Sequence, residues 1–214
     1  MSNKKKIAVY VDGFNLYHAL KNLKKPYLKW LNIRSLVEKF INQQGEVIDK
    51  IYYFSAIATH INNDVAKRHR VYIEALETFG VQFIEGHFKK KEHTCNIKDR
   101  VNLTLYKHEE KETDVNIAIH MVRDSLLKKF DKLILITNDT DINPAIEMAK
   151  KENPAIEIKL LTPPTYKTHD SLHKAIAPGK ATVISEKHIE LSLLPPSLTK
   201  QNGKIIHRPQ EYTP

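Results

Sequence analysis

The chain has few of the features that mark secreted or membrane-embedded proteins. It contains one cysteine, Cys95, among 214 residues, so no disulfide can form within it. No apolar run approaches the ~20 residues that a membrane-spanning helix needs. The basic start at residues 1–6 leads directly into an apolar strand pattern, whereas a signal peptide would continue into a longer apolar segment. We therefore expect a cytoplasmic protein without a membrane partner.

Acidic residues are outnumbered by basic ones. The chain has 34 Lys and Arg against 25 Asp and Glu, which gives a formal net charge of +9. A basic surface attracts polyanions, and nucleic acids are the most abundant of these. Lysines that only keep a protein soluble would produce the same balance. Charge therefore agrees with nucleic-acid binding without establishing it.

Apolar periodicity predicts a regular alternation of strands and helices. Strands are expected at residues 7–11, 47–57, 81–88, 132–137, 156–161 and 182–185, and helices at residues 14–20, 31–41, 65–79, 113–129, 141–151 and 171–176. This order predicts an α/β fold, a three-layer α/β/α sandwich around a mainly parallel sheet. The polar residues 89–100 are expected to form a loop. One domain is expected over residues 1–194, followed by a tail over residues 195–214 that is either flexible or docked.

Three short acidic stretches carry the functional signal. They are residues 11–15 (VDGFN), 112–116 (ETDVN) and 137–141 (TNDTD). The first and third come at the ends of expected strands, and the ends of neighbouring parallel strands lie at one edge of a sheet. Carboxylates crowded at that edge repel each other unless a divalent cation lies among them. Oxygen ligands suit Mg²⁺ or Mn²⁺, and such a site beside a basic surface points to phosphodiester chemistry.

Each acidic residue also has a purely structural explanation. Asp114 and Asp141 could cap the helices that they begin, because a carboxylate stabilises a helix N-terminus. Asp12 and Asp139 could belong to ordinary turns. Capping and turn formation do not require these residues to converge. Their predicted placement at one edge therefore favours a shared site.

The same stretches resemble the three motifs of the NYN domain family, a branch of the PIN-like nucleases. The resemblance covers residues 10–16 (YVDGFNL), 109–116 (EEKETDVN) and 136–144 (ITNDTDINP), in the family's order, over the first three quarters of the chain. It implies a PIN-like, Rossmann-like fold and a ribonuclease that depends on Mg²⁺ or Mn²⁺. By motif matching, Asp12, Asp114 and Asp139 are the core metal ligands, and Asp141 is a further ligand, direct or through water.

The resemblance also implies roles for two polar neighbours. Asn15 is a support near the metal or the scissile phosphate, and Thr137 takes the place of the small hydroxyl residue that ends the strand. The chain departs from many relatives at Asn138, where they have Gly, and at Ile142, where they have Phe. Neither change removes a carboxylate, but both bear on substrate access.

An RNA partner requires cations near the site. The candidates around the second acidic motif and in the loop that precedes it are Lys89, Lys90, Lys91, Arg100, Lys107 and Lys111. Bases of a single strand could also stack on Tyr17 or Tyr106, although Tyr17 has the helical spacing of a core residue. Whether the protein forms a homo-oligomer stays open.

Two other functional classes share parts of this pattern. A haloacid-dehalogenase-like phosphatase needs Asp-x-Asp after its first strand, and Phe14 occupies the second acidic position here. A non-catalytic RNA-binding or protein-interaction module of the same fold is the stronger alternative. The complete set of carboxylates argues for the enzyme.

Overall fold

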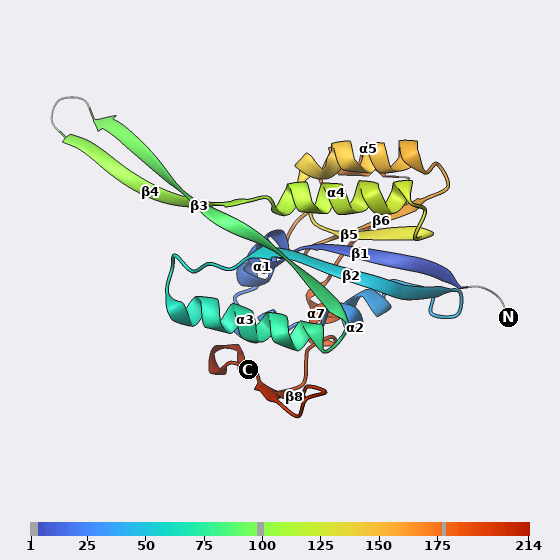
Figure 1. Cartoon of the computed structure of the whole chain (residues 1–214), viewed down its shortest axis with the longest axis horizontal. Coiled ribbons are helices and arrows are strands. Elements are labelled where there is room, and N and C mark those ends of the chain that lie inside the picture. Colours follow the sequence, from blue (N-terminus) through green and yellow to red (C-terminus); the bar gives the residue numbers. More distant parts are fainter. Residues whose placement is uncertain (1–3, 98–100, 177–178) are drawn as a thin grey trace.

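A seven-stranded sheet lies between two layers of helices (Figure 1). The computed structural model describes residues 4–97, 101–176 and 179–214. Its strand order is β4-β3-β2-β1-β5-β6-β7, and all neighbours are parallel except β3 and β4. This arrangement confirms the predicted three-layer α/β/α sandwich. The strands are β1 (Lys5–Asp12), β2 (Glu46–Ala56), β3 (Val81–Ile97), β4 (Val101–Lys111), β5 (Lys132–Ile136), β6 (Glu157–Thr162) and β7 (Ala181–Val183).

The helices follow the predicted order, with shorter pieces between them. The α-helices are α1 (Gly13–Asn22), α2 (Ile33–Glu38), α3 (Asn63–Glu77), α4 (Thr113–Leu126), α5 (Asn143–Glu152), α6 (Asp170–Ala175) and α7 (Glu186–Glu190). The 3₁₀ turns are η1 (Pro26–Lys29), η2 (Thr140–Ile142) and η3 (Gln210–Tyr212). Every helix predicted from periodicity is present, whereas α7 was not predicted. None of the described helices combines the length and apolar character that a membrane crossing requires.

The sheet has a hydrophobic core on each face because successive side chains of a strand point to opposite sides. On β1, Val9 and Val11 pack into the core beneath α1, α2 and α3, which also holds Trp30. Ala8 and Tyr10 pack into the other core, beneath α4 and α5. Both helical layers can be followed in Figure 1. The central strands are therefore fixed on both sides, and their carboxyl ends form a rigid edge.

A long antiparallel arm replaces the predicted loop over residues 89–97, whereas residues 98–100 of that prediction lie outside the described part of the chain. β3 continues to Ile97 and pairs with β4, from His87 opposite Lys111 to Ile97 opposite Val101. In Figure 1 this arm projects well beyond the helical layers. The prediction was wrong because the arm buries little apolar surface, so its sequence lacks the alternation that marks a half-buried strand. Arg100 lies outside the described residues.

Residues 195–214 lie against the helical layer that contains α3. A small hairpin of β8 (Ser197–Thr199) and β9 (Ile205–His207) leads to η3. Ile206 is buried in the α1–α3 core, and the indole Nε1 of Trp30 donates a 2.9 Å hydrogen bond to the carbonyl of Pro195. Arg68 on α3 pairs with Glu211 at 2.6 Å. Apolar and ionic contacts thus hold this segment to the domain.

Candidate functional site

Asp12 is the central residue at the carboxyl edge of the sheet. It is the last residue of β1 and the N-cap of α1, and only 4% of its surface is exposed. β1 lies between β2 and β5, at the point where the strand order reverses, which is where open α/β sheets bind ligands. Asp12 is therefore a buried carboxylate at the expected binding crevice.

Two hydrogen bonds fix the Asp12 carboxylate. The backbone N–H of Asn15 donates to Oδ1 at 2.9 Å, and the hydroxyl of Thr137 donates to Oδ2 at 2.8 Å. Thr137 follows β5 directly, and its hydroxyl also accepts the N–H of Asp139 at 3.0 Å. Asn15 in turn accepts the N–H of Asn138 through its side-chain Oδ1 at 3.1 Å. The first and third acidic motifs are thus joined by a network of short polar contacts.

Gly13 allows this close arrangement of β1, α1 and β2. A Cβ atom at this position would lie 2.7 Å from the carbonyl oxygen of Phe54 and 2.7 Å from the ring of Tyr53. Any larger side chain would therefore push α1 away from β2. The glycine that follows Asp12 in the first motif is therefore required for steric reasons.

Burial and the surrounding charges disfavour ionisation of Asp12. Burial raises the pKa of its carboxyl to about 7, against the opposing effect of the Asn15 and Thr137 hydrogen bonds. The negative charges of Asp114 and Glu110 contribute to the same increase. Burial and the charges of Asp139 and Asp141 likewise raise the pKa of Asp114. The four predicted ligands consequently lie within one shared electrostatic field.

The individual positions of the other three carboxylates differ. Asp114 lies in the first turn of α4, on the exposed side. Asp139 caps η2, and its Oδ1 accepts the N–H of Asp141 at 3.0 Å. Asp141 is exposed. The capping roles considered for Asp114 and Asp141 were wrong, because Glu112 and Ile142 are the N-cap residues of α4 and α5. Asp12 and Asp139, which were considered as turn residues, are the residues that cap α1 and η2 with their side chains.

Glu110 is a site residue that sequence reasoning missed. It lies near the end of β4, accepts a hydrogen bond from the Thr113 hydroxyl, and has a pKa raised by burial and by Asp114. Its position depends on the antiparallel arm, which periodicity did not reveal. The acidic run in the second motif contained the residue, but nothing in the sequence distinguished it from Glu109.

The basic residues of the arm divide between its two faces. Phe88, Lys90, Tyr106, His108 and Glu110 share one face by strand alternation and pairing. The remaining predicted RNA contacts of the arm, Lys89, Lys91, Lys107 and Lys111, share the other face. The predicted cationic platform is therefore split, and only Lys90 lies on the face of Glu110.

The lysines on the second face are partly neutralised by Glu109. Its carboxylate lies 2.6 Å from the Nζ of Lys91, 3.1 Å from that of Lys111 and 3.8 Å from that of Lys107. Hydrogen bonds from Lys91 and Lys111 lower the pKa of Glu109 to about 2. On the first face, the Nζ of Lys90 lies 3.6 Å from the centre of the Tyr106 ring. Lys90 and Tyr106 thus form a joint cationic and aromatic contact surface.

Comparison with known families decides the affiliation. The sequence pattern of the NYN domain family matches residues 6–177, which include all three acidic motifs and most of the sheet. This chain belongs to the NYN domain family. NYN domains are nuclease-like and associated with RNA, so the family agrees with the chemistry expected of the carboxylate edge.

One curated relative of this NYN domain has a different named activity. It is the 6-hydroxy-3-succinoylpyridine 3-monooxygenase HspA of Pseudomonas putida, which is 29% identical over 175 aligned residues. The match covers 66% of this chain and 54% of the relative, so the chain spans about half the length of that protein.

A solved structure shares the fold of this NYN domain. It is a protein of unknown function, VPA0982, from Vibrio parahaemolyticus, with a TM-score of 0.57 and 16% sequence identity. The alignment covers 91% of this chain and 99% of that one. At this identity, the likeness supports the architecture alone.

The donor set of the NYN site suits a hard divalent cation because all its predicted ligands are carboxylates. Among the described residues, however, no three Asp, Glu, His or Cys side chains are close enough together to hold an ion as they stand. Burial, and after it the charges of neighbouring carboxylates, raise the pKa of both Asp12 and Asp114. An ion held by these carboxylates would therefore require side-chain movements that bring their oxygens together.

Proposed function

We propose that this NYN domain is a metal-dependent ribonuclease that hydrolyses phosphodiester bonds of single-stranded RNA. Asp12, Asp114, Asp139 and Asp141 would hold Mg²⁺ or Mn²⁺. The supporting observation is the buried Asp12 carboxylate, whose pKa is raised by burial and by neighbouring carboxylates. A buried group with such a pKa in a crevice is a strong candidate for a functional role. We further propose a cytoplasmic setting, with which the single cysteine agrees.

Each residue of the site has a role within this proposal. Asp12 is the anchoring ligand because two hydrogen bonds already fix its orientation. Asn15 and Thr137 position that ligand and link it to the segment that carries Asp139. Glu110 adds negative charge beside Asp12, either as a further ligand or as a base for the attacking water. When bound, the cation supplies an activated water and neutralises charge on the phosphate.

The proposal is tested by cleavage and by metal binding, measured separately. Wild-type protein is incubated with a panel of single-stranded RNAs in Mg²⁺, Mn²⁺ or EDTA, beside Asp12→Asn and Asp139→Asn. Asp49→Asn is the matched control, because Asp49 is an exposed carboxylate near the beginning of β2. Binding of Mn²⁺ to each protein is measured by electron paramagnetic resonance. We expect cleavage and Mn²⁺ binding in wild type and control, and neither in the two site variants.

Two results would redirect the assignment. Near-wild-type cleavage by both site variants would reject the carboxylate site. RNA binding without cleavage in any metal would favour the non-catalytic RNA-binding module.

A second candidate function comes from the named activity of the Pseudomonas putida relative, whose match covers 66% of this chain. It would make this protein an oxygenase of a substituted pyridine. The test supplies 6-hydroxy-3-succinoylpyridine with O₂ and NADH as reductant, and follows NADH and O₂ consumption. If NADH and O₂ were consumed only when the pyridine was present, and no RNA were cleaved, the oxygenase would be favoured over the ribonuclease.

A further inference from the structure

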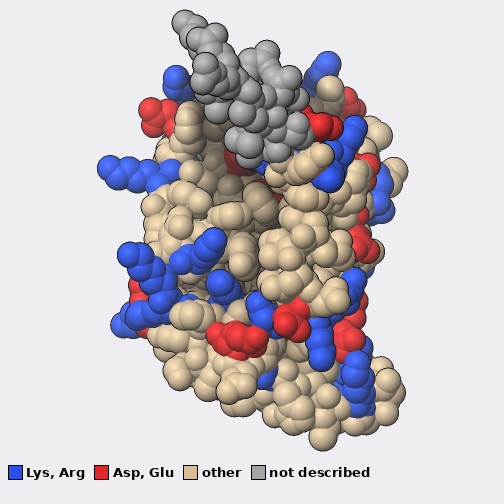
Figure 2. Space-filling view, turned by 90° about the vertical axis from the view of Figure 1, so that its left-hand side faces the viewer, with Lys and Arg blue, Asp and Glu red and all other residues tan. Residues whose placement is uncertain are grey.

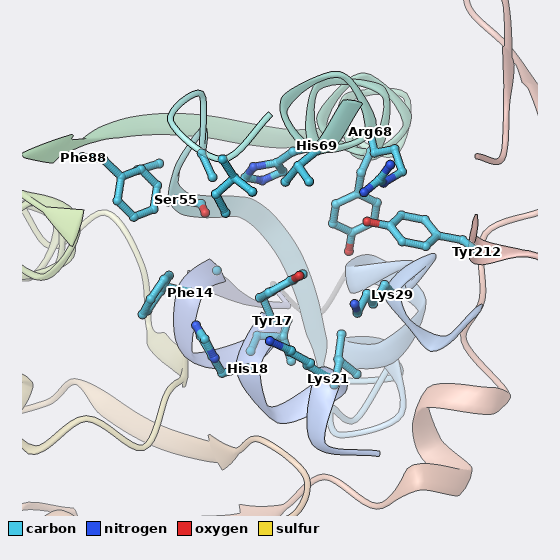
Figure 3. A pocket seen from close by; sticks show the side chains of 18 of the residues that line it. Phe14, Tyr17, His18, Lys21, Lys29, Ser55, Arg68, His69, Phe88 and Tyr212 are labelled. Atoms are coloured by element: carbon cyan, nitrogen blue, oxygen red, sulfur yellow. The ribbon is translucent and has the colours of Figure 1, made fainter. Parts of the chain in front are cut away.

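A large cavity lies beside the carboxylate edge, on the side of the sheet covered by α1 and α3. Its volume is about 490 Å³, within the usual range for small-molecule sites. Figure 3 shows Phe14 and Phe88 at one end, Tyr212 at the other, and Tyr17 between them. In Figure 2 the face below the arm is hollowed and largely uncharged at its centre, with basic and acidic side chains along its margin. The molecule thus presents an apolar hollow with charged surroundings.

Six Phe and Tyr side chains line the cavity. They come from five different elements, with Phe14 and Tyr17 on α1, Tyr53 on β2, Tyr72 on α3, Phe88 on β3 and Tyr212 on η3. Phe14 and Tyr17 are each 40% exposed, whereas the buried face of α1 is formed by Gly13, Leu16, Ala19 and Leu20. Tyr17 therefore lines the cavity and is not the core residue that its helical spacing favoured. Such walls suit a planar ring, which can stack against them or meet them edge-on.

Imidazole groups add hydrogen-bonding capacity to this apolar wall. His69 on α3 has a pKa lowered to about 4 by burial and by the charge of Arg70, so its ring is neutral near pH 7. Its Nε2 lies 3.4 Å from the hydroxyl of Tyr53. Burial and the charges of Lys21 and Lys29 lower the pKa of His18 as well. A neutral imidazole can donate and accept, as recognition of ring heteroatoms requires.

The charged residues of the cavity favour an anion. Among the described lining residues, Lys21, Lys29 and Arg68 carry positive charge, and Glu211 carries the only carboxylate. Glu211 pairs with Arg68, whereas the Nζ of Lys29 lies 4.8 Å from the centre of the Tyr17 ring. An anionic group attached to a ring in the cavity would therefore find positive charge at its edge.

The C-terminal segment completes the cavity and holds its far wall in place. Tyr212 belongs to η3, and the Arg68–Glu211 ion pair connects the residue before it to α3. At the other end, Gly13 and Phe14 line the cavity and directly follow Asp12. A ligand in the cavity would lie next to the carboxylate edge.

We propose that this cavity binds a planar heteroaromatic ring carrying an anionic group, the chemistry of a nucleotide. Two sources offer this chemistry, namely a nucleotide within an RNA strand and a free aromatic acid. Binding does not require cleavage or a metal, so the site stands independently of the ribonuclease proposal.

The test measures binding in EDTA by isothermal titration calorimetry. The probes are UMP, AMP, a short single-stranded RNA, nicotinate as a free aromatic acid, and ribose 5-phosphate as an anion without an aromatic ring. Val65→Trp fills the cavity, since Val65 lines it from the first turn of α3. Val47→Trp is the matched control, because Val47 is an exposed valine on β2 away from this cavity. Lys29→Glu reverses the charge at the edge and removes the contact of Lys29 with the Tyr17 ring. It serves as the test if the tryptophan of Val65→Trp disturbs folding.

We expect at least one aromatic anion to bind wild type about tenfold or more tightly than ribose 5-phosphate. Val65→Trp should weaken the affinity for this anion by a similar factor, and Lys29→Glu should weaken it severalfold. Val47→Trp should have the affinity of wild type. Binding of nucleotides and RNA alone identifies the strand as the source, and binding of nicotinate alone identifies a free acid. The proposal is overturned if no aromatic anion binds, or if Val65→Trp and Lys29→Glu both bind as wild type does.

Discussion

The hydroxyl of Thr137 donates a 2.8 Å hydrogen bond to the buried carboxylate of Asp12 and so joins the ends of β5 and β1. The bond stabilises the ionised form of Asp12 and fixes the orientation of the carboxylate. Thr137→Val should therefore weaken Mn²⁺ binding by about tenfold or more, a typical effect of losing a residue that orients a ligand. Thr137→Ser should retain most of the affinity because it keeps the hydroxyl. Equal affinity of the valine variant and wild type, measured by electron paramagnetic resonance, would contradict this role.

Removing the charge of Asp12 should stabilise the metal-free protein. Asp12 is 4% exposed and its ionised form lies near other carboxylates. We expect Asp12→Asn in EDTA at pH 8 to gain on the order of 1 kcal/mol or more, because an uncompensated buried charge is costly. Addition of Mn²⁺ should raise the melting temperature of wild type and leave that of the variant unchanged. A variant less stable than wild type in EDTA would show that the carboxylate's hydrogen bonds outweigh its repulsion.

Gly13→Ala should destabilise the domain. The added Cβ would lie 2.7 Å from the Phe54 carbonyl oxygen and from the Tyr53 ring, so α1 or β2 must shift. Overpacking of this kind costs about 1–3 kcal/mol. Gly45→Ala is the matched control, because the nearest atom to its Cβ would be 3.7 Å away. Urea denaturation of the two variants should differ, and equal midpoints would show that the contact at Gly13 relaxes freely.

His69 should make stability dependent on pH. Its pKa is about 4 in the folded protein and 6.5 in an ordinary environment, so the unfolded chain binds the extra proton between these values. Stability contributed by the neutral ring is complete above pH 6.5 and is lost as the pH falls toward 4, by up to about 3 kcal/mol. His69→Phe should reduce the dependence of the free energy of unfolding on pH, measured by urea denaturation at pH 7.5, 6.5, 5.5 and 4.5. Parallel curves for variant and wild type would exclude His69 as the titrating group.

The two faces of the arm should contribute unequally to RNA binding. Lys90 lies with Tyr106 on the face of Glu110, whereas Lys91 is paired with Glu109 on the other face. Lys90→Gln should weaken binding and reduce the salt dependence of log K by about 0.7, the expected value for one lost phosphate contact with a single strand. Lys91→Gln should have a smaller effect. Fluorescence anisotropy at several salt concentrations measures the RNA affinity of both variants. A larger loss of affinity for Lys91→Gln than for Lys90→Gln would show that the opposite face of the arm contacts the RNA.

Much of the fold was predictable because its central strands and covering helices have strong local patterns. β1 and β5 are continuous apolar runs, buried on both faces, and the predicted bounds differ from the observed ones by only a few residues. The arm was missed because its outer part is rich in charged residues and its pairing joins segments without apolar periodicity. Glu110 was missed for the same reason, since its approach to Asp12 and Asp114 requires the arm.

The sequence by itself determined the order of elements, the sandwich architecture and the presence of acidic motifs at the ends of β1 and β5. These features follow from local periodicity and from the rule that neighbouring parallel strands end at one edge. Only the tertiary structure decided how Thr137 holds Asp12, which face of the arm carries Lys90, and that Tyr212 closes an aromatic cavity. These depend on contacts between residues far apart in the chain, and no local pattern encodes the distance between them.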